Sequence, residues 1–253
     1  VTFLIFSIGL YLFTKEYFND KNQAFYTLIV MLFFWGIGFG WSNEYSFKLF
    51  RITLCYPSIF AFSLSFSGFY FILKYIKTKN FKYYFYSLVL GFIIFLSHPI
   101  TGSFFFLAIL LLVLSERSDV MTKLAVFGLP IIVVILSCFW PYFPFLETVS
   151  KTGSSFFFHT ATFFTPTIIY RIGPALIGLP IVLNYFIKRE YKFVYYGFFV
   201  FFLIYIFSYS LTTFSTKYNV TFGARYTFFF LFFFYLSLFF SLSLPSLIFL
   251  QGI

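Results

Sequence analysis

Charged side chains are scarce in this sequence of 253 residues. Lys, Arg, Asp and Glu together make up 9% of the chain, against about 25% in ordinary soluble domains. A soluble fold needs a polar surface, and its surface-to-volume ratio limits how much apolar area it can bury. The composition therefore argues against a water-soluble domain.

The common signatures of catalytic and metal sites are also missing. The two cysteines, Cys55 and Cys138, lie in apolar runs without the spacing of a CxxC or metal-binding motif, so we interpret them as packing residues. No HExxH, GxSxG or Walker pattern occurs. None of these motifs therefore indicates a metal or catalytic site.

Apolar residues make up 61% of the chain, and 49 of them are Phe. A bilayer solvates apolar side chains on every side of a helix, so Phe can take the place of Leu as the residue that faces lipid. We therefore predict an all-α fold, a polytopic bundle of transmembrane helices that forms a single domain over residues 1–253. Apolar windows between charged breaks predict about nine spans, at residues 1–14, 24–41, 52–73, 83–97, 103–115, 124–146, 167–187, 193–213 and 226–250.

The region 83–115 is interpreted as two spans rather than one. Pro99 and Gly102 punctuate its middle, and its length greatly exceeds the roughly 20 residues that one crossing needs. A tight turn near His98 is expected to join the two.

The basic residues predict which way the bundle points. The connections at 15–23, 74–82, 116–123 and 188–192 fall on one side and hold 11 of the 17 Lys and Arg residues. By the positive-inside rule this side is cytoplasmic. We expect the membrane to be a prokaryotic plasma membrane. The net charge of +10 then reports topology and attraction to anionic lipids, with no nucleic acid partner. Val1 falls outside, so we expect the chain to be a fragment that lacks at least one N-terminal span.

Glu44 lies in the first outer connection that the sequence shows. A carboxylate there can act as a general base towards an acceptor hydroxyl or as a metal ligand. It can equally be a solvated side chain paired with Lys48 or Arg51.

His98 lies in the run Ser97-His98-Pro99-Ile100-Thr101-Gly102. A histidine at the end of an apolar helix costs free energy unless it is hydrogen-bonded or faces water, and the turn frees backbone N–H groups that could bind an anion. The alternative is a helix turn with an interfacial histidine.

Arg171 and Arg225 stand at the starts of two predicted spans. Guanidinium groups bind phosphate oxygens bidentately, so both are candidates for holding a lipid phosphate. Arginines near helix ends also snorkel to the headgroups without any ligand.

The longest outer segment supplies possible sugar or loop contacts. Its rings could stack on a sugar or an isoprenoid, although aromatic belts occur at every membrane surface. The candidates in it are Trp140, Tyr142, Glu147 and His159.

Together these motifs resemble the GT-C superfamily of polytopic membrane glycosyltransferases. The resemblance is carried by Trp41 and Glu44, Tyr56-Pro57-Ser58, the run Ser97–Gly102, Trp140-Pro141-Tyr142 and Gly223-Ala224-Arg225-Tyr226. It implies an enzyme that moves a sugar from a polyprenyl-phosphate donor to an acceptor on the extracytoplasmic face. Glu44 and His98 would be catalytic, Arg171 and Arg225 would hold the donor phosphate, and a divalent cation is compatible with the chemistry.

Two other classes stay open. A transporter or flippase is suggested by the helix interruption at Gly173-Pro174 and Gly178-Leu179-Pro180, although no acidic residue lies in the middle of a span to couple a cation. A noncatalytic subunit of a membrane complex would also suit a chain so poor in reactive residues.

Overall fold

Residues 1–33, 56–141 and 178–215 are described by the computed structural model, the last range with side chains to residue 203. Within these ranges the chain forms eight α-helices and no strand, which confirms the all-α prediction for the described part. The helices are α1 (Thr2–Phe18), α2 (Lys21–Phe33), α4 (Pro57–Thr78), α5 (Phe81–Ser97), α6 (Pro99–Ser115), α7 (Val120–Cys138), α11 (Leu179–Lys188) and α12 (Lys192–Ser215).

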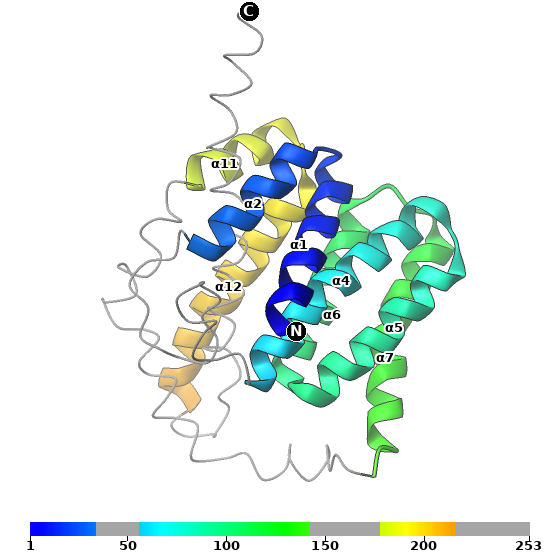
Figure 1. The fold of residues 1–253 in the computed structure, drawn as a ribbon. Coiled ribbons are helices and arrows are strands. Elements are labelled where there is room, and N and C mark those ends of the chain that lie inside the picture. Colours follow the sequence, from blue (N-terminus) through cyan, green and yellow to red (C-terminus); the bar gives the residue numbers. More distant parts are fainter. Residues whose placement is uncertain (34–55, 142–177, 216–253) are drawn as a thin grey trace, which may run out of the picture.

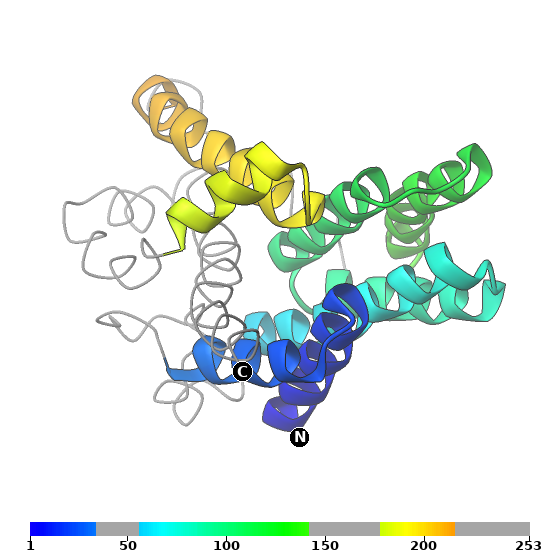
Figure 2. The same cartoon turned by 90° about the horizontal axis from the view of Figure 1, so that it is seen from above.

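The helices follow one another as up-and-down hairpins (Figure 1). The turns α1–α2, α4–α5, α6–α7 and α11–α12 all lie at the upper end of the bundle in Figure 1, whereas the α5–α6 turn lies at the lower end. Seen from above, α11 and α12 occupy one edge of the molecule and α5 and α7 the other (Figure 2). The four predicted cytoplasmic connections therefore share one end, which we call the lysine end.

The helix α4 lies at the centre and packs against α1, α5 and α6. Large aromatic side chains fill the space between these helices, because aromatic rings bury much area and pack edge to face. Phe66 on α4, for example, stands edge-on to Phe6 of α1 with ring centroids 5.4 Å apart, and Phe69 stacks on Phe105 of α6 at 5.4 Å. The fully buried rings are Phe6, Phe13, Phe62, Phe66, Phe69, Phe104, Phe105, Phe193 and Phe201.

Glycine lets two helix pairs approach closely. A Cβ added to Gly9 of α1 would lie 2.8 Å from the Ser67 hydroxyl oxygen and 3.0 Å from its backbone nitrogen on α4. In the α5–α6 hairpin, a Cβ on Gly102 would lie 2.9 Å from the Cα of Phe95. Close helix contact through small residues is common where helices associate without a hydrophobic driving force.

Several helices expose apolar faces to their surroundings. On α7 the side chains of Leu124, Ile131 and Ile135 are more than half exposed, and Phe81 and Phe85 are exposed on α5. In the described part, α4 and α7 are the two helices long and apolar enough to cross a membrane, a test that the core helix of a soluble protein also passes. Only 28% of the apolar window of α7 is buried, so α7 is unlike such a core helix.

Most predicted spans coincide with an observed helix, and 83–115 is indeed two helices with a turn at His98. The prediction of 124–146 was too long, since α7 ends at Cys138. The cause is local. A proline disfavours helical backbone at the residue before it, and Pro141 follows Trp140. The predicted span 226–250 lies wholly outside the described residues, as do parts of four others, at residues 34–41, 52–55, 142–146 and 167–177.

Candidate functional site

The structure describes two of the eight candidate site residues, His98 and Trp140. His98 stands in the α5–α6 turn and Trp140 just beyond the C-terminus of α7, so both lie at the end of the bundle opposite the lysine end (Figure 1). The remaining candidates, Glu44, Tyr142, Glu147, His159, Arg171 and Arg225, lie outside the described residues.

His98 ends α5 and begins α6. Its backbone N–H donates to the Ile94 carbonyl at 2.9 Å and closes α5, while its ring Nδ1 accepts the backbone N–H of Thr101 at 3.3 Å as the N-cap of α6. The Thr101 hydroxyl lies 2.8 Å from the same Nδ1. Pro99 follows at the first helical position, where its missing N–H costs nothing. The cap therefore requires a lone pair on Nδ1 and assigns the ring proton of a neutral His98 to Nε2.

The backbone of this turn is less available to an anion than its sequence suggested. The N–H of Thr101 donates to the His98 ring, and the N–H of Gly102 donates to the His98 carbonyl at 2.9 Å. Backbone groups of this turn are expected from the sequence to be free for an anion, but the N-cap and the first helical hydrogen bond of α6 use these two. The structure thus gives His98 a capping role beside any chemical one.

Trp140 has 43% of its surface exposed. Its ring stands edge-on to Phe92 of α5, with ring centroids 5.7 Å apart. A ring that is half packed and half exposed suits either a membrane interface or contact with an apolar or sugar ligand.

All charged side chains of the described Lys, Arg, Asp and Glu residues gather at the lysine end, in its four turns or the helix turns next to them. The opposite end of the described part, with His98 and Trp140, carries no such side chain. The basic members are Lys15, Lys21, Lys74, Lys77, Lys79, Lys82, Arg117, Lys123, Lys188, Arg189 and Lys192, and the acidic ones are Glu16, Asp20, Glu116, Asp119 and Glu190.

Glu16 ties the end of α1 to the end of α4. One carboxylate oxygen lies 2.7 Å from Lys74 Nζ and the other 3.0 Å from Lys77 Nζ, and Lys77 also donates to the Glu16 carbonyl at 2.6 Å. Partial burial would raise the pKa of this carboxyl, but the hydrogen bonds from the two lysines outweigh it and hold the pKa below its usual value.

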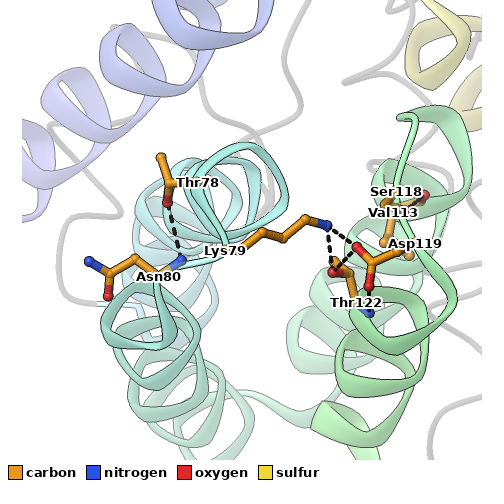
Figure 3. A network of polar contacts seen from close by, with 7 residues as sticks. All are labelled: Thr78, Lys79, Asn80, Val113, Ser118, Asp119 and Thr122. Carbon is orange, nitrogen blue, oxygen red and sulfur yellow. Dashed lines mark hydrogen bonds and ion pairs between the residues drawn. The ribbon is translucent and has the colours of Figure 1, made fainter.

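A second polar contact joins the α4–α5 and α6–α7 turns (Figure 3). Lys79 binds the carboxylate of Asp119 and donates to the Thr122 hydroxyl at 2.6 Å. Asp119 also accepts the Thr122 backbone N–H at 3.0 Å, which makes it the N-cap of α7. The hydrogen bond from Lys79, followed by those from Thr122, lowers the pKa of Asp119.

Glu116 lies near these pairs but has a different environment. It closes α6, with its backbone N–H donating to Leu112 at 3.1 Å, and its side chain is half-buried. Burial raises the pKa of its carboxyl, and the charge of Lys77 opposes that effect only in part.

Sequence reasoning missed the helix caps at the lysine end. Asp20 accepts the N–H of Asn22 at 2.7 Å where α2 begins, and Asn80 accepts that of Lys82 at 3.0 Å where α5 begins. Asp and Asn before an apolar helix are a recognised start signal, so these caps could have been predicted. The pairing of Glu16 with Lys74 and Lys77 could not, because the partners lie about 60 residues apart in sequence.

In the ranges that the structure describes, no group of three or more His, Cys, Asp or Glu side chains is arranged to hold a metal ion. Comparisons of the chain with protein-family models, with curated proteins and with solved structures found no match.

Proposed function

We propose that this chain is a multi-pass membrane protein of about nine spans whose lysine end faces the cytoplasm. The carrying observation is the separation of charge, because every described Lys, Arg, Asp and Glu lies at one end of the bundle. Water on all sides would impose no such separation, whereas a bilayer forces charges to its faces and biases Lys and Arg to the cytoplasmic one.

Helix dimensions and exposed faces agree with this placement. At 1.5 Å per residue, the 19 residues of α7 and the 22 of α4 extend about 28 and 33 Å, close to the roughly 30 Å of a bilayer's hydrocarbon core. The exposed residues of α7, such as Ile131 and Ile135, would meet lipid rather than water. In a soluble protein, an apolar outer face of this kind would favour aggregation.

Within this placement we propose sugar transfer at the opposite end, on the extracytoplasmic face. The proposal rests on the resemblance to GT-C glycosyltransferases and on the position of His98 and Trp140 away from the lysine end. A water-soluble nucleotide sugar does not reach that face, so the donor would be a sugar linked to a polyprenyl phosphate with its tail between helices.

Sugar transfer needs a base for the acceptor, groups that stabilise the leaving phosphate, and contacts to the sugar. Glu44 would take the proton of the acceptor hydroxyl, whose oxygen bonds to the anomeric carbon as the bond to the donor phosphate breaks. Polyprenyl phosphate leaves with the bonding electrons, so positive or hydrogen-bonding groups must stabilise its growing charge. Arg171, Arg225 and His98 are the candidates for that task, and Trp140, Tyr142, Glu147 and His159 for contacts to the sugar.

The test is a transfer assay on the chain reconstituted in vesicles. The donors are radiolabelled glucose, mannose and arabinose on undecaprenyl phosphate, with membrane extracts as acceptors, and the readout is the radiolabel that leaves the donor lipid. We expect one donor to be consumed, and Glu44→Gln to lower its rate at least a hundredfold. Glu16→Gln, which removes a carboxylate at the lysine end, is the matched control and should keep the rate within twofold at neutral pH.

Folded, membrane-inserted protein that consumes none of these donors would overturn the transferase proposal and leave the membrane placement untouched. Full transfer by Glu44→Gln would overturn the assignment of the base.

A further inference from the structure

Three of the five carboxylates described at the lysine end form ion pairs or a helix cap, whereas Glu190 of the α11–α12 turn forms neither. Glu16 forms ion pairs with Lys74 and Lys77, and Asp119 forms one with Lys79. Asp20 caps α2. These contacts fix the ends of α1, α4 and α7 relative to one another and account for three of the cations.

Other cations at this end have no such partner. Six Lys and Arg side chains make no ion pair, side-chain hydrogen bond or ring contact with any residue that the structure describes, and five of the six are exposed. They are Lys21, Arg117, Lys123, Lys188, Arg189 and Lys192, of which Lys123 is the half-buried one.

Four of these cations belong to two adjacent turns. The α11–α12 turn contributes Lys188, Arg189 and Lys192 within five residues, and the α1–α2 turn contributes Lys21. Rings hold the two turns together, since Tyr191 of the first turn lies edge-on to Phe18 at the end of α1, with centroids 5.4 Å apart. We call Lys21, Lys188, Arg189 and Lys192 the cationic patch.

The folding of the helices does not explain the whole patch. Lys188, in the last turn of α11, is favoured there by the partial negative charge of a helix C-terminus. Lys21 and Lys192, in contrast, are the first residues of α2 and α12, where the helix dipole disfavours a cation. Asp20 caps α2 beside Lys21, and Glu190 precedes Lys192 by two residues, but neither carboxylate forms an ion pair with a Lys or Arg of the described residues. The four exposed cations therefore have no ion-pair partner among the described residues and can meet an anion outside the protein.

We propose that the cationic patch binds the phosphate headgroups of anionic lipids in the cytoplasmic leaflet. The proposal rests on the membrane placement, because that placement sets the four side chains at headgroup depth, and it does not depend on sugar transfer. The same two turns also carry aromatic rings that pack on one another, Phe18, Tyr185 and Tyr191, and such rings suit the boundary between headgroups and acyl chains. The lysines bound to Glu16 and Asp119 are not available for this task.

The test compares two variants with the same loss of three positive charges. The patch variant carries Lys188→Gln, Arg189→Gln and Lys192→Gln, and the control carries Lys74→Gln, Lys77→Gln and Lys79→Gln. Purified protein in neutral detergent micelles is titrated with phosphatidylglycerol or phosphatidylcholine, and native mass spectrometry counts the lipids retained. Thermal unfolding and gel filtration establish that each variant is folded.

We expect the unsubstituted chain to retain phosphatidylglycerol at least tenfold more tightly than phosphatidylcholine, and the patch variant to fall within twofold of no preference. The control should lose thermal stability but keep most of the preference. Equal retention of both lipids by the unsubstituted chain, or an equal loss of preference in the two variants, would overturn the proposal.

A third arm separates lipid from soluble phosphate. Inorganic phosphate at 10 mM should leave phosphatidylglycerol bound, since the lipid is held at a surface by several cations and its chains. Displacement of the lipid by inorganic phosphate, but not by the same ionic strength of sodium chloride, would overturn the commitment to lipid. No sugar donor is present, so a negative result here is distinct from a failure of the transferase proposal.

Discussion

Single side chains at the lysine end decide how the helices meet there. Glu16 accepts from two lysines that follow one another on the same face of α4, so one carboxylate fixes the ends of two helices. The exposed fractions are 21% for Glu16, 27% for Lys74 and 40% for Lys77, so water screens the Glu16–Lys74 pair less than it screens a fully exposed pair.

The pH dependence of stability should report Glu16. Its pKa is lowered in the folded chain below the usual 4.5, so its pairing stabilises the fold above that pH and the contribution is lost as the pH falls through the folded pKa. At pH 6, Glu16→Gln should cost about 0.5–1 kcal/mol. Thermal unfolding in detergent from pH 6 to pH 3 should show the two proteins converging below about pH 4.5, and a constant difference would contradict this role.

Substitutions at His98 separate its capping role from its chemistry. Asn keeps a side-chain acceptor at an N-cap and Ala does not, so His98→Ala should cost about 1 kcal/mol of stability and His98→Asn only a few tenths. Thermal unfolding measures the difference, and equal losses would contradict the cap. In the transfer assay both variants should be slow if the His98 ring assists the leaving phosphate, because neither offers a donor at the position of Nε2.

At the scale of helices, apolar windows predicted where α4, α5 and α6 lie, but not where they begin. The windows for α5 and α6 started at residues 83 and 103, whereas the helices begin at Phe81 and Pro99. The difference arises because hydropathy ignores the first turn, which is set by the capping residues Asn80 and His98. The candidate site was predictable only as a set of residue types, since contacts between distant helices leave no mark on a local pattern.

Two glycines in neighbouring helices should respond oppositely to alanine. Gly102→Ala places a Cβ 2.9 Å from the backbone of Phe95, which forces α5 and α6 apart at a cost of about 1–3 kcal/mol. Gly128 of α7 has no atom within 4 Å of its added Cβ, so Gly128→Ala should gain about 0.5–1 kcal/mol from helix propensity. Thermal unfolding of both variants in the same detergent compares the two, and a loss at both positions would contradict the described packing.

Across the whole molecule, the arrangement of charge connects the fold to the proposed function. Helices that rise and descend in turn bring four connections to one end, and those connections carry every described charged side chain. The other end is left to histidine and aromatic residues in the described part, which is the face where a lipid-linked donor would be met. Orientation in the membrane is therefore the premise of both the transferase and the lipid-binding proposals.

Orientation is measured most directly by labelling single cysteines in intact cells with a membrane-impermeant maleimide. In a Cys55→Ala, Cys138→Ala background, Phe139→Cys reports the end of α7, where the native side chain is 81% exposed, and Asn80→Cys reports the exposed α4–α5 turn at the lysine end. We predict that Phe139→Cys is labelled in intact cells and Asn80→Cys only after permeabilisation. Equal labelling of the two cysteines in intact cells, or the reverse pattern, would contradict the proposed membrane placement.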